Sequence, residues 1–239
     1  MANGIGTQLL GELIGTFLLI VLGCGIGAGA SLKKTKSEQN SWLTIAIGWG
    51  LAVAISVYVS SPLGPGHLNP AVTLAMAVTG NLPWSSVLPY IAAQFAGAFL
   101  GAVALWLKYY PHWAETKDSS TILGVFSTSP AIRHLPANIF SEGMGTAVLV
   151  FAVLSFSKIE FVAGLQPIVV GMLITVIILA MGGTTGAALN PARDLAPRVA
   201  HAILPIPNKE GSDWGYAWIP VVAPILGGLA AAWLYQLVP

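Results

Sequence analysis

The chain has 239 residues, of which 55% are hydrophobic and only 8% are charged. A soluble domain carries roughly a quarter charged residues, so this composition excludes an ordinary soluble protein and indicates an integral membrane protein. The formal net charge of +1 is too small to indicate a nucleic-acid partner, and no basic cluster supports one, so we expect none. The single cysteine, Cys24, excludes an intrachain disulfide and a cysteine-based metal site, and we expect it to pack as a small apolar residue.

Six stretches of the chain are apolar and long enough to cross a bilayer, which takes about 20 residues of helix. In chain order they are roughly 7–28, 42–60, 87–107, 138–157, 163–182 and 216–237. A longer polar connection, 108–137, separates the third span from the fourth. Two further segments, 69–80 and 190–204, are too short to span the membrane but too apolar for ordinary loops. We expect each of them to be a half-helix that enters the membrane and turns back.

An internal repeat relates the two halves of the chain. Glu12, Gly15 and Thr16 recur in the same spacing as Glu142, Gly145 and Thr146. Each half holds three spans, and an odd number makes the second half enter from the opposite side of the membrane. The sequence therefore predicts an all-α membrane protein of six transmembrane helices and two re-entrant half-helices. We expect a single channel domain, 1–239, built from inverted repeats at about 1–107 and 138–239.

The tripeptide Asn-Pro-Ala opens both short segments, as Asn69, Pro70 and Ala71 and again as Asn190, Pro191 and Ala192. Asparagine is a strong N-cap residue and proline is favoured at the first helical position. A half-helix of about 10 residues rises about 15 Å, half the hydrocarbon thickness. One copy could merely cap an ordinary short helix, but two copies at equivalent places predict helix N-termini that meet near the membrane midplane.

Two facing helix N-termini have an electrostatic consequence. Each carries roughly half a positive charge, so together they disfavour cations and protons. The amides of Asn69 and Asn190 would donate to a passing oxygen, and a water held by both cannot continue a proton-conducting chain. Backbone carbonyls would add a ladder of acceptors, from Pro65, Gly66, His67 and Leu68 and from Ala187, Ala188 and Leu189. This arrangement suits small neutral solutes with hydroxyl groups.

Glu12 and Glu142 are costly inside a membrane, which makes them functional candidates. A proton relay is one interpretation, but no chain of further titratable groups accompanies them. We prefer the alternative that each carboxylate accepts hydrogen bonds from the backbone of a re-entrant loop, and we expect Asp194 to brace the loop of Arg193. The spacing of His112, His134 and His201 is not typical of ligands, so we expect no metal site.

The stretches "HLNPAV" and "LNPARD" resemble the paired motifs of the aquaporin family, and the resemblance covers nearly the whole chain. Asp194, Arg198 and the Pro220-Val221 pair are similar to the aquaglyceroporin, or glycerol uptake facilitator, branch. The resemblance implies an aquaporin-like right-handed bundle, a homotetramer with one pore per subunit, passive conduction and no cofactor. It also implies a plasma-membrane location with cytoplasmic termini. Counting lysines and arginines in the connections favours the opposite orientation, and we follow the resemblance.

The narrowest point in that family is built from four positions, which fall here on Trp49, Ile178, Ala187 and Arg193. By this resemblance, Arg193 would donate to solute oxygens and repel cations, and Trp49 would face the carbon backbone of a solute. A phenylalanine is expected where Ala187 stands and a glycine where Ile178 stands. We therefore expect a pore that is less aromatic and broader than one tuned to glycerol.

These observations predict a passive channel for glycerol and water. We also expect it to pass bulkier neutral solutes such as dihydroxyacetone, urea or undissociated lactic acid, and to exclude ions and protons. A secondary transporter is the alternative, because inverted repeats and broken helices occur there too. An enzyme is disfavoured, since the sequence offers no nucleophile–base pair or metal cluster. The expected partners are the lipid bilayer and the solutes themselves.

Overall fold

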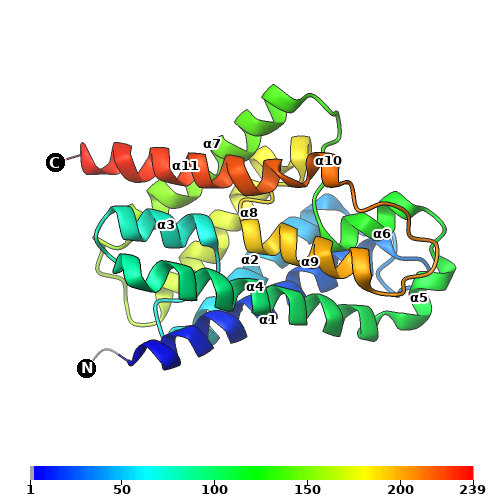
Figure 1. Cartoon of the computed structure of the whole chain (residues 1–239), viewed down its shortest axis with the longest axis horizontal. Coiled ribbons are helices and arrows are strands. Elements are labelled where there is room, and N and C mark those ends of the chain that lie inside the picture. The colour runs from blue at the N-terminus through cyan, green and yellow to red at the C-terminus, as the bar shows by residue number, and fades with distance from the viewer. Residues whose placement is uncertain (1–2, 239) are drawn as a thin grey trace.

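A computed structural model describes residues 3–238, and helices account for all the regular structure in that range. The helices are α1 (Ile5–Ser31), α2 (Trp42–Ser60), α3 (Pro70–Val78), α4 (Trp84–Lys108), α5 (Tyr110–Glu115), α6 (Ser119–Phe126), α7 (Leu135–Phe156), α8 (Leu165–Thr185), α9 (Pro191–Ile203), α10 (Trp214–Ala217) and α11 (Ile219–Gln236). Within the described residues, six helical segments are long and apolar enough to cross a membrane, the last comprising α10 and α11 together. Both termini lie at the same end of the molecule (Figure 1). The predicted all-α membrane fold is confirmed.

The boundaries of several elements differ from the prediction. The first span, expected at 7–28, extends further at both ends, from Ile5 to Ser31. The last span is interrupted after Ala217, and Pro220 lies in the first turn of the helix that follows. The connection 108–137, predicted as a loop, contains α5, α6 and the start of α7. Helix α6 begins at a polar cap, Asp118, and buries the apolar residues near its end, which polar composition alone did not indicate.

The long helices approach one another closely where glycines meet backbone. Helix α1 packs along α4, α7 packs along α11, and α2 crosses α8. A Cβ atom at Gly50 would clash with the carbonyl of Gly171, and one at Gly171 would clash with the carbonyl of Gly50. Gly227 lies in the same way against the carbonyl of Gly143. Small residues at such crossings allow the close backbone contact that is typical of membrane helix pairs.

Helices α3 and α9 are the two predicted half-helices, with 9 and 13 residues. At 1.5 Å per residue they are about 14 and 20 Å long, too short to cross about 30 Å of hydrocarbon. The side chain of Asn69 accepts a hydrogen bond from the N–H of Ala71, and Asn190 accepts from Ala192 and Arg193. The two helices follow one another along the length of the molecule (Figure 1) and both pack against α4 and α11. They are thus enclosed by the long helices.

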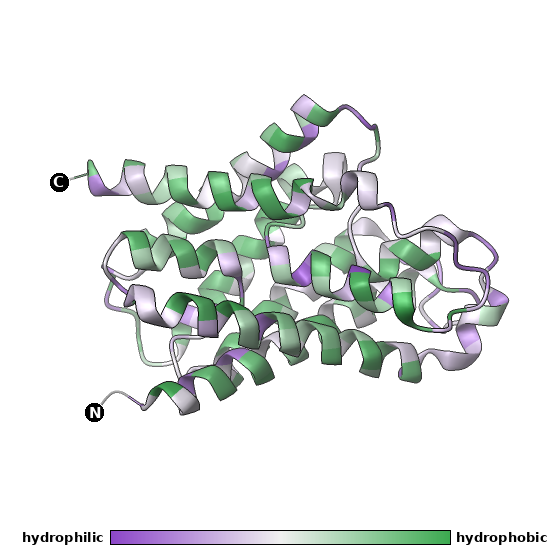
Figure 2. Ribbon diagram, viewed as in Figure 1, coloured by the Kyte–Doolittle hydropathy of each residue, from purple (hydrophilic) through white to green (hydrophobic). Residues whose placement is uncertain are grey.

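The surface of the bundle is predominantly hydrophobic along the long helices, and polar residues gather at the connections around α5 and α6 (Figure 2). Large apolar side chains such as Leu51, Leu88 and Met172 are exposed on the outer faces. In water such a surface would be unfavourable, whereas in lipid it is required. The distribution fits a bundle surrounded by a bilayer.

Candidate solute pathway

A cavity of about 840 Å³ lies between the long helices and reaches past both Asn-Pro-Ala motifs. Its lining includes Tyr58 and Ser157 near the C-terminal ends of α2 and α7, and Thr121 and Ser129 in and after α6. Twelve residues singled out from the sequence line it: Trp49, Pro65, Gly66, His67, Leu68, Asn69, Ile178, Ala187, Ala188, Leu189, Asn190 and Arg193. The remaining candidates do not line it: Pro70, Ala71, Pro191, Ala192, Glu12, Glu142 and Asp194.

The N-termini of α3 and α9 are joined by two reciprocal hydrogen bonds. Nδ2 of Asn69 donates to the carbonyl of Leu189 at 2.8 Å, and Nδ2 of Asn190 donates to the carbonyl of Leu68 at 2.7 Å. Both leucine carbonyls were expected to accept hydrogen bonds from a solute, and in the structure each accepts a hydrogen bond from the asparagine of the other motif. A carboxamide carries two N–H groups and a carbonyl two lone pairs, so each group retains hydrogen-bonding capacity.

The loops that lead into these helices contain residues in the left-handed backbone region. Leu68 has φ 53°, Ala187 has φ 50° and Leu189 has φ 54°. For a residue with a Cβ atom this conformation costs about 1–2 kcal/mol. The loops therefore need a specific source of stabilisation to keep their carbonyl groups in place.

Two buried carboxylates supply that stabilisation. Glu12 accepts hydrogen bonds from the backbone N–H groups of His67 and Leu68, both at 2.7 Å. Glu142 accepts from those of Ala188 and Leu189, both at 3.0 Å. The pairs are equivalent in the two halves, and each carboxylate binds both N–H groups that precede an asparagine. Charge-assisted hydrogen bonds of this kind are roughly twice as strong as neutral ones.

The four residues predicted to form the narrowest point, Trp49, Ile178, Ala187 and Arg193, all line the cavity. The guanidinium carbon of Arg193 lies 4.3 Å from the ring centroid of Trp49, and Nη1 donates to the carbonyl of Phe126 at 3.2 Å. Among residues 3–238, no carboxylate lies within ion-pair distance of Arg193. Its contacts at the cavity are therefore with an aromatic ring and a carbonyl group and not with a carboxylate.

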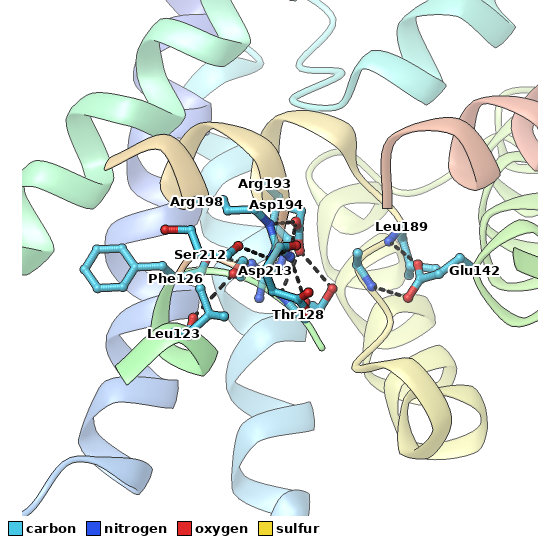
Figure 3. A network of polar contacts seen from close by, with 12 residues as sticks. Leu123, Phe126, Thr128, Glu142, Leu189, Arg193, Asp194, Arg198, Ser212 and Asp213 are labelled. Atoms are coloured by element: carbon cyan, nitrogen blue, oxygen red, sulfur yellow. Dashed lines mark hydrogen bonds and ion pairs between the residues drawn. The ribbon is translucent and has the colours of Figure 1, made fainter. Parts of the chain in front are cut away.

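Behind Arg193, a buried ion pair ties α9 to two connections (Figure 3). Asp194 accepts from Nε and Nη2 of Arg198, at 3.0 and 2.8 Å, and both side chains are fully buried. Asp194 also accepts from the backbone N–H and the hydroxyl of Thr128, at 2.7 and 2.8 Å. Arg198 donates to the carbonyls of Thr128 and Ser212, at 2.8 and 2.9 Å.

This network was only partly anticipated from the sequence. Asp194 was expected to brace the loop of Arg193, and in the structure it binds Thr128, two residues after Phe126, whose carbonyl accepts from Arg193 at the C-terminal end of α6. Phe126, Thr128 and Ser212 were not identified as site residues. The pairing of Asp194 with Arg198 was not predicted, although their spacing of four residues on one helix face is a signal that could have indicated it.

The outer end of α9 is capped by a lysine. Nζ of Lys209 donates to the carbonyls of His201, Ala202 and Leu204, at 2.7, 2.8 and 2.5 Å. A cation is favourable at a helix C-terminus because the last carbonyls lack partners within the helix. Partial burial lowers the pKa of the Lys209 ammonium below its ordinary value. Both ends of α9 are therefore fixed by side chains.

No group of three or more histidine, cysteine, aspartate or glutamate side chains able to hold a metal ion occurs among residues 3–238. His201, one of the histidines considered from the sequence, has its Nδ1 atom 2.8 Å from the hydroxyl of Ser212. Its ring packs against Phe126. The imidazole of His201 therefore packs beside the network of Asp194 and Arg198.

Comparison with known proteins gives three consistent findings. The family model described as Major intrinsic protein matches residues 4–235. "Glycerol uptake facilitator protein 3" of Lactiplantibacillus plantarum is 54% identical over 239 residues, all of both chains, and "Glycerol uptake facilitator protein" of Bacillus subtilis is 53% identical over 222 residues, 93% of this chain and 81% of the relative. The X-ray structure of the aquaglyceroporin from Plasmodium falciparum has a TM-score of 0.87 at 30% identity, covering 98% of this chain and 97% of its own.

Proposed function

Because this chain belongs to the major intrinsic protein family of membrane channels, in its aquaglyceroporin branch, we propose that it is a passive channel for glycerol and other small uncharged solutes. The observation that carries the proposal is the cavity past the two motifs, which combines an arginine and asparagine amides with apolar side chains. Relatives named as glycerol uptake facilitators support glycerol as the reference solute.

The polar groups along the cavity would hold the hydroxyl groups of a solute. At the narrow point, Arg193 donates to a hydroxyl oxygen while Trp49 and Ile178 face the carbon atoms. At the junction, the second N–H groups of Asn69 and Asn190 donate to the next oxygen. A water held there donates its own hydrogens away from the junction, so protons do not pass along a water chain. The charge of Arg193 and the two helix N-termini repel cations.

The small side chain of Ala187 supports a broader solute range. Ala187 supplies one methyl group to the cavity wall, and Ile178 refills only part of the space. We propose that water, dihydroxyacetone, urea and undissociated lactic acid pass as well as glycerol. Each of these is neutral and has oxygen or nitrogen atoms whose hydrogen bonds with water can be replaced by hydrogen bonds with the groups that line the cavity.

The contacts of the buried carboxylates favour a channel over a secondary transporter. A transporter needs groups that bind a coupling ion or proton and respond to it. Glu12 and Glu142 do not line the cavity, and both are occupied by backbone N–H groups. Asp194 is paired with Arg198. The remaining charge along the cavity is that of Arg193, and its guanidinium is suited to donate hydrogen bonds to a solute.

The proposal includes the setting of the channel. An even number of candidate spans supports a topology with both termini on one side of the membrane, and we assign that side to the cytoplasm of a plasma-membrane protein. The equivalent contacts of Glu12 and Glu142 support inverted repeats at about 1–107 and 138–239, joined by 108–137. We further propose a homotetramer in which each subunit contains its own pore.

Swelling of proteoliposomes in a graded solute series tests the proposal. We expect rapid flux of glycerol, water, urea and dihydroxyacetone, linear in solute concentration and with a low activation energy. Lactic acid should pass only at a pH low enough to protonate it. Saturable uptake coupled to an ion gradient would instead identify a transporter, and passage of glycerol without any bulkier solute would remove the proposed range.

A further inference from the structure

Trp42, the first residue of α2, contacts α8 beside the cavity-lining residues Ile178 and Ala187. Its indole Nε1 donates to the carbonyl of Ile178 at 3.3 Å. The ring lies over Gly182, where an added Cβ atom would be 2.8 Å from Cζ2 of Trp42 and 3.5 Å from the Cβ atom of Ala187. Trp42, Ile178 and Ala187 therefore surround one position that has no side chain.

Trp42 also shares the cavity-facing side of α2 with Trp49. The two residues are two helical turns apart, so they lie on the same face at an axial separation of about 10 Å. Ile45 and Val53, on the same face, line the cavity together with both tryptophans. Residue Trp42 is 42% exposed, in contrast to the nearly buried Trp49. A solute entering from this end would meet Trp42 before it meets Trp49.

We propose that Trp42 is a specificity-determining residue, whose indole forms the outer aromatic wall of the solute path on the side that Ala187 leaves open. This inference rests on the proposed channel function. The hydrogen bond to Ile178 satisfies the indole N–H and fixes the ring, so the ring presents only apolar atoms to the carbon skeleton of a polyol. The bare backbone at Gly182 provides the space that the ring occupies. Trp42 thereby limits the width available to solutes longer than glycerol.

Removing the ring should widen the path for larger polyols. We expect Trp42→Ala to raise the ratio of ribitol to glycerol permeability in proteoliposomes by about threefold or more, a small change in a transport barrier. Trp42→Phe retains a ring but loses the hydrogen bond, so its ratio should lie between those of the wild type and Trp42→Ala. Trp84→Ala is the matched control, because Trp84 is 62% exposed and does not line the cavity; its ratio should equal the wild-type ratio.

A second variant acts on the support of the ring. In Gly182→Ala the new methyl group must displace the indole of Trp42, so the ribitol-to-glycerol ratio should change even though Trp42 is present. This variant and Trp42→Phe decide the question if Trp42→Ala does not fold. If the wild type conducts glycerol and every variant that folds keeps the wild-type ribitol-to-glycerol ratio, the inference about Trp42 is overturned and the proposed channel function is not. A wild type that passes no glycerol would overturn the proposed function first.

Discussion

The size of residue 187 gives a direct handle on the solute range at the level of a single residue. Ala187 lines the cavity and is otherwise nearly buried. We expect Ala187→Phe to retain glycerol flux and to reduce the flux of bulkier neutral solutes about tenfold, a barrier increase of about 1.4 kcal/mol. The measurement is stopped-flow swelling with the same solute series before and after the substitution. Unchanged permeabilities would show that residue 187 does not set the width.

Asp194 is the residue whose loss should disturb the site most without touching a solute. Asp194→Asn leaves the buried guanidinium of Arg198 without a counter-charge, and breaking such a pair costs about 3–5 kcal/mol. We expect a lower unfolding midpoint in detergent and reduced glycerol flux, since Thr128 is released next to Phe126, whose carbonyl binds Arg193. Glu115→Gln, which removes the exposed pair with Lys34, is the control and should leave the midpoint unchanged. Equal midpoints for both variants would argue against a structural role for the buried pair.

At the level of elements, the sequence predicts well what depends on neighbouring residues. The caps of α3 and α9 follow from asparagine followed by proline, because the side chain of each asparagine binds an N–H only two residues further along. Contacts between distant segments were less accessible. Thr128 lies 66 residues before Asp194. Nothing in the polar sequence of the connection 108–137 indicated that the carbonyl and hydroxyl groups of Thr128 would contact α9.

The crossing of α7 and α11 allows a test at the same level. Gly227→Ala places a methyl group against the backbone of Gly143, where neither side can move cheaply. We expect destabilisation of about 1–3 kcal/mol, the usual cost of overpacking. Gly183→Ala is the matched control, because it makes the same change in a helix with open space around it. There alanine should stabilise slightly, by up to about 1 kcal/mol, through helix propensity. Thermal unfolding in detergent gives both values, and effects of the same sign would contradict the packing described here.

For the whole molecule, the repeat in the sequence was sufficient to predict the architecture. Three spans in each half and a helix-start signal in each connection leave few ways to bury the polar backbone of two short segments. The details that shape the path were not predictable in the same way. The reciprocal asparagine bonds and the contact of Trp42 with Ile178 join residues far apart in the sequence. No local pattern specifies these contacts.

The central claim is that two half-helices meeting at Asn69 and Asn190 hold open a path that passes neutral solutes and rejects protons. The most direct test measures both fluxes in one preparation of proteoliposomes, with light scattering for glycerol and an enclosed pH-sensitive dye for protons. We predict rapid glycerol entry and, under an imposed pH gradient, proton leakage no faster than in protein-free vesicles. Glycerol flux that is absent, or that is accompanied by fast dissipation of the pH gradient, would contradict the account.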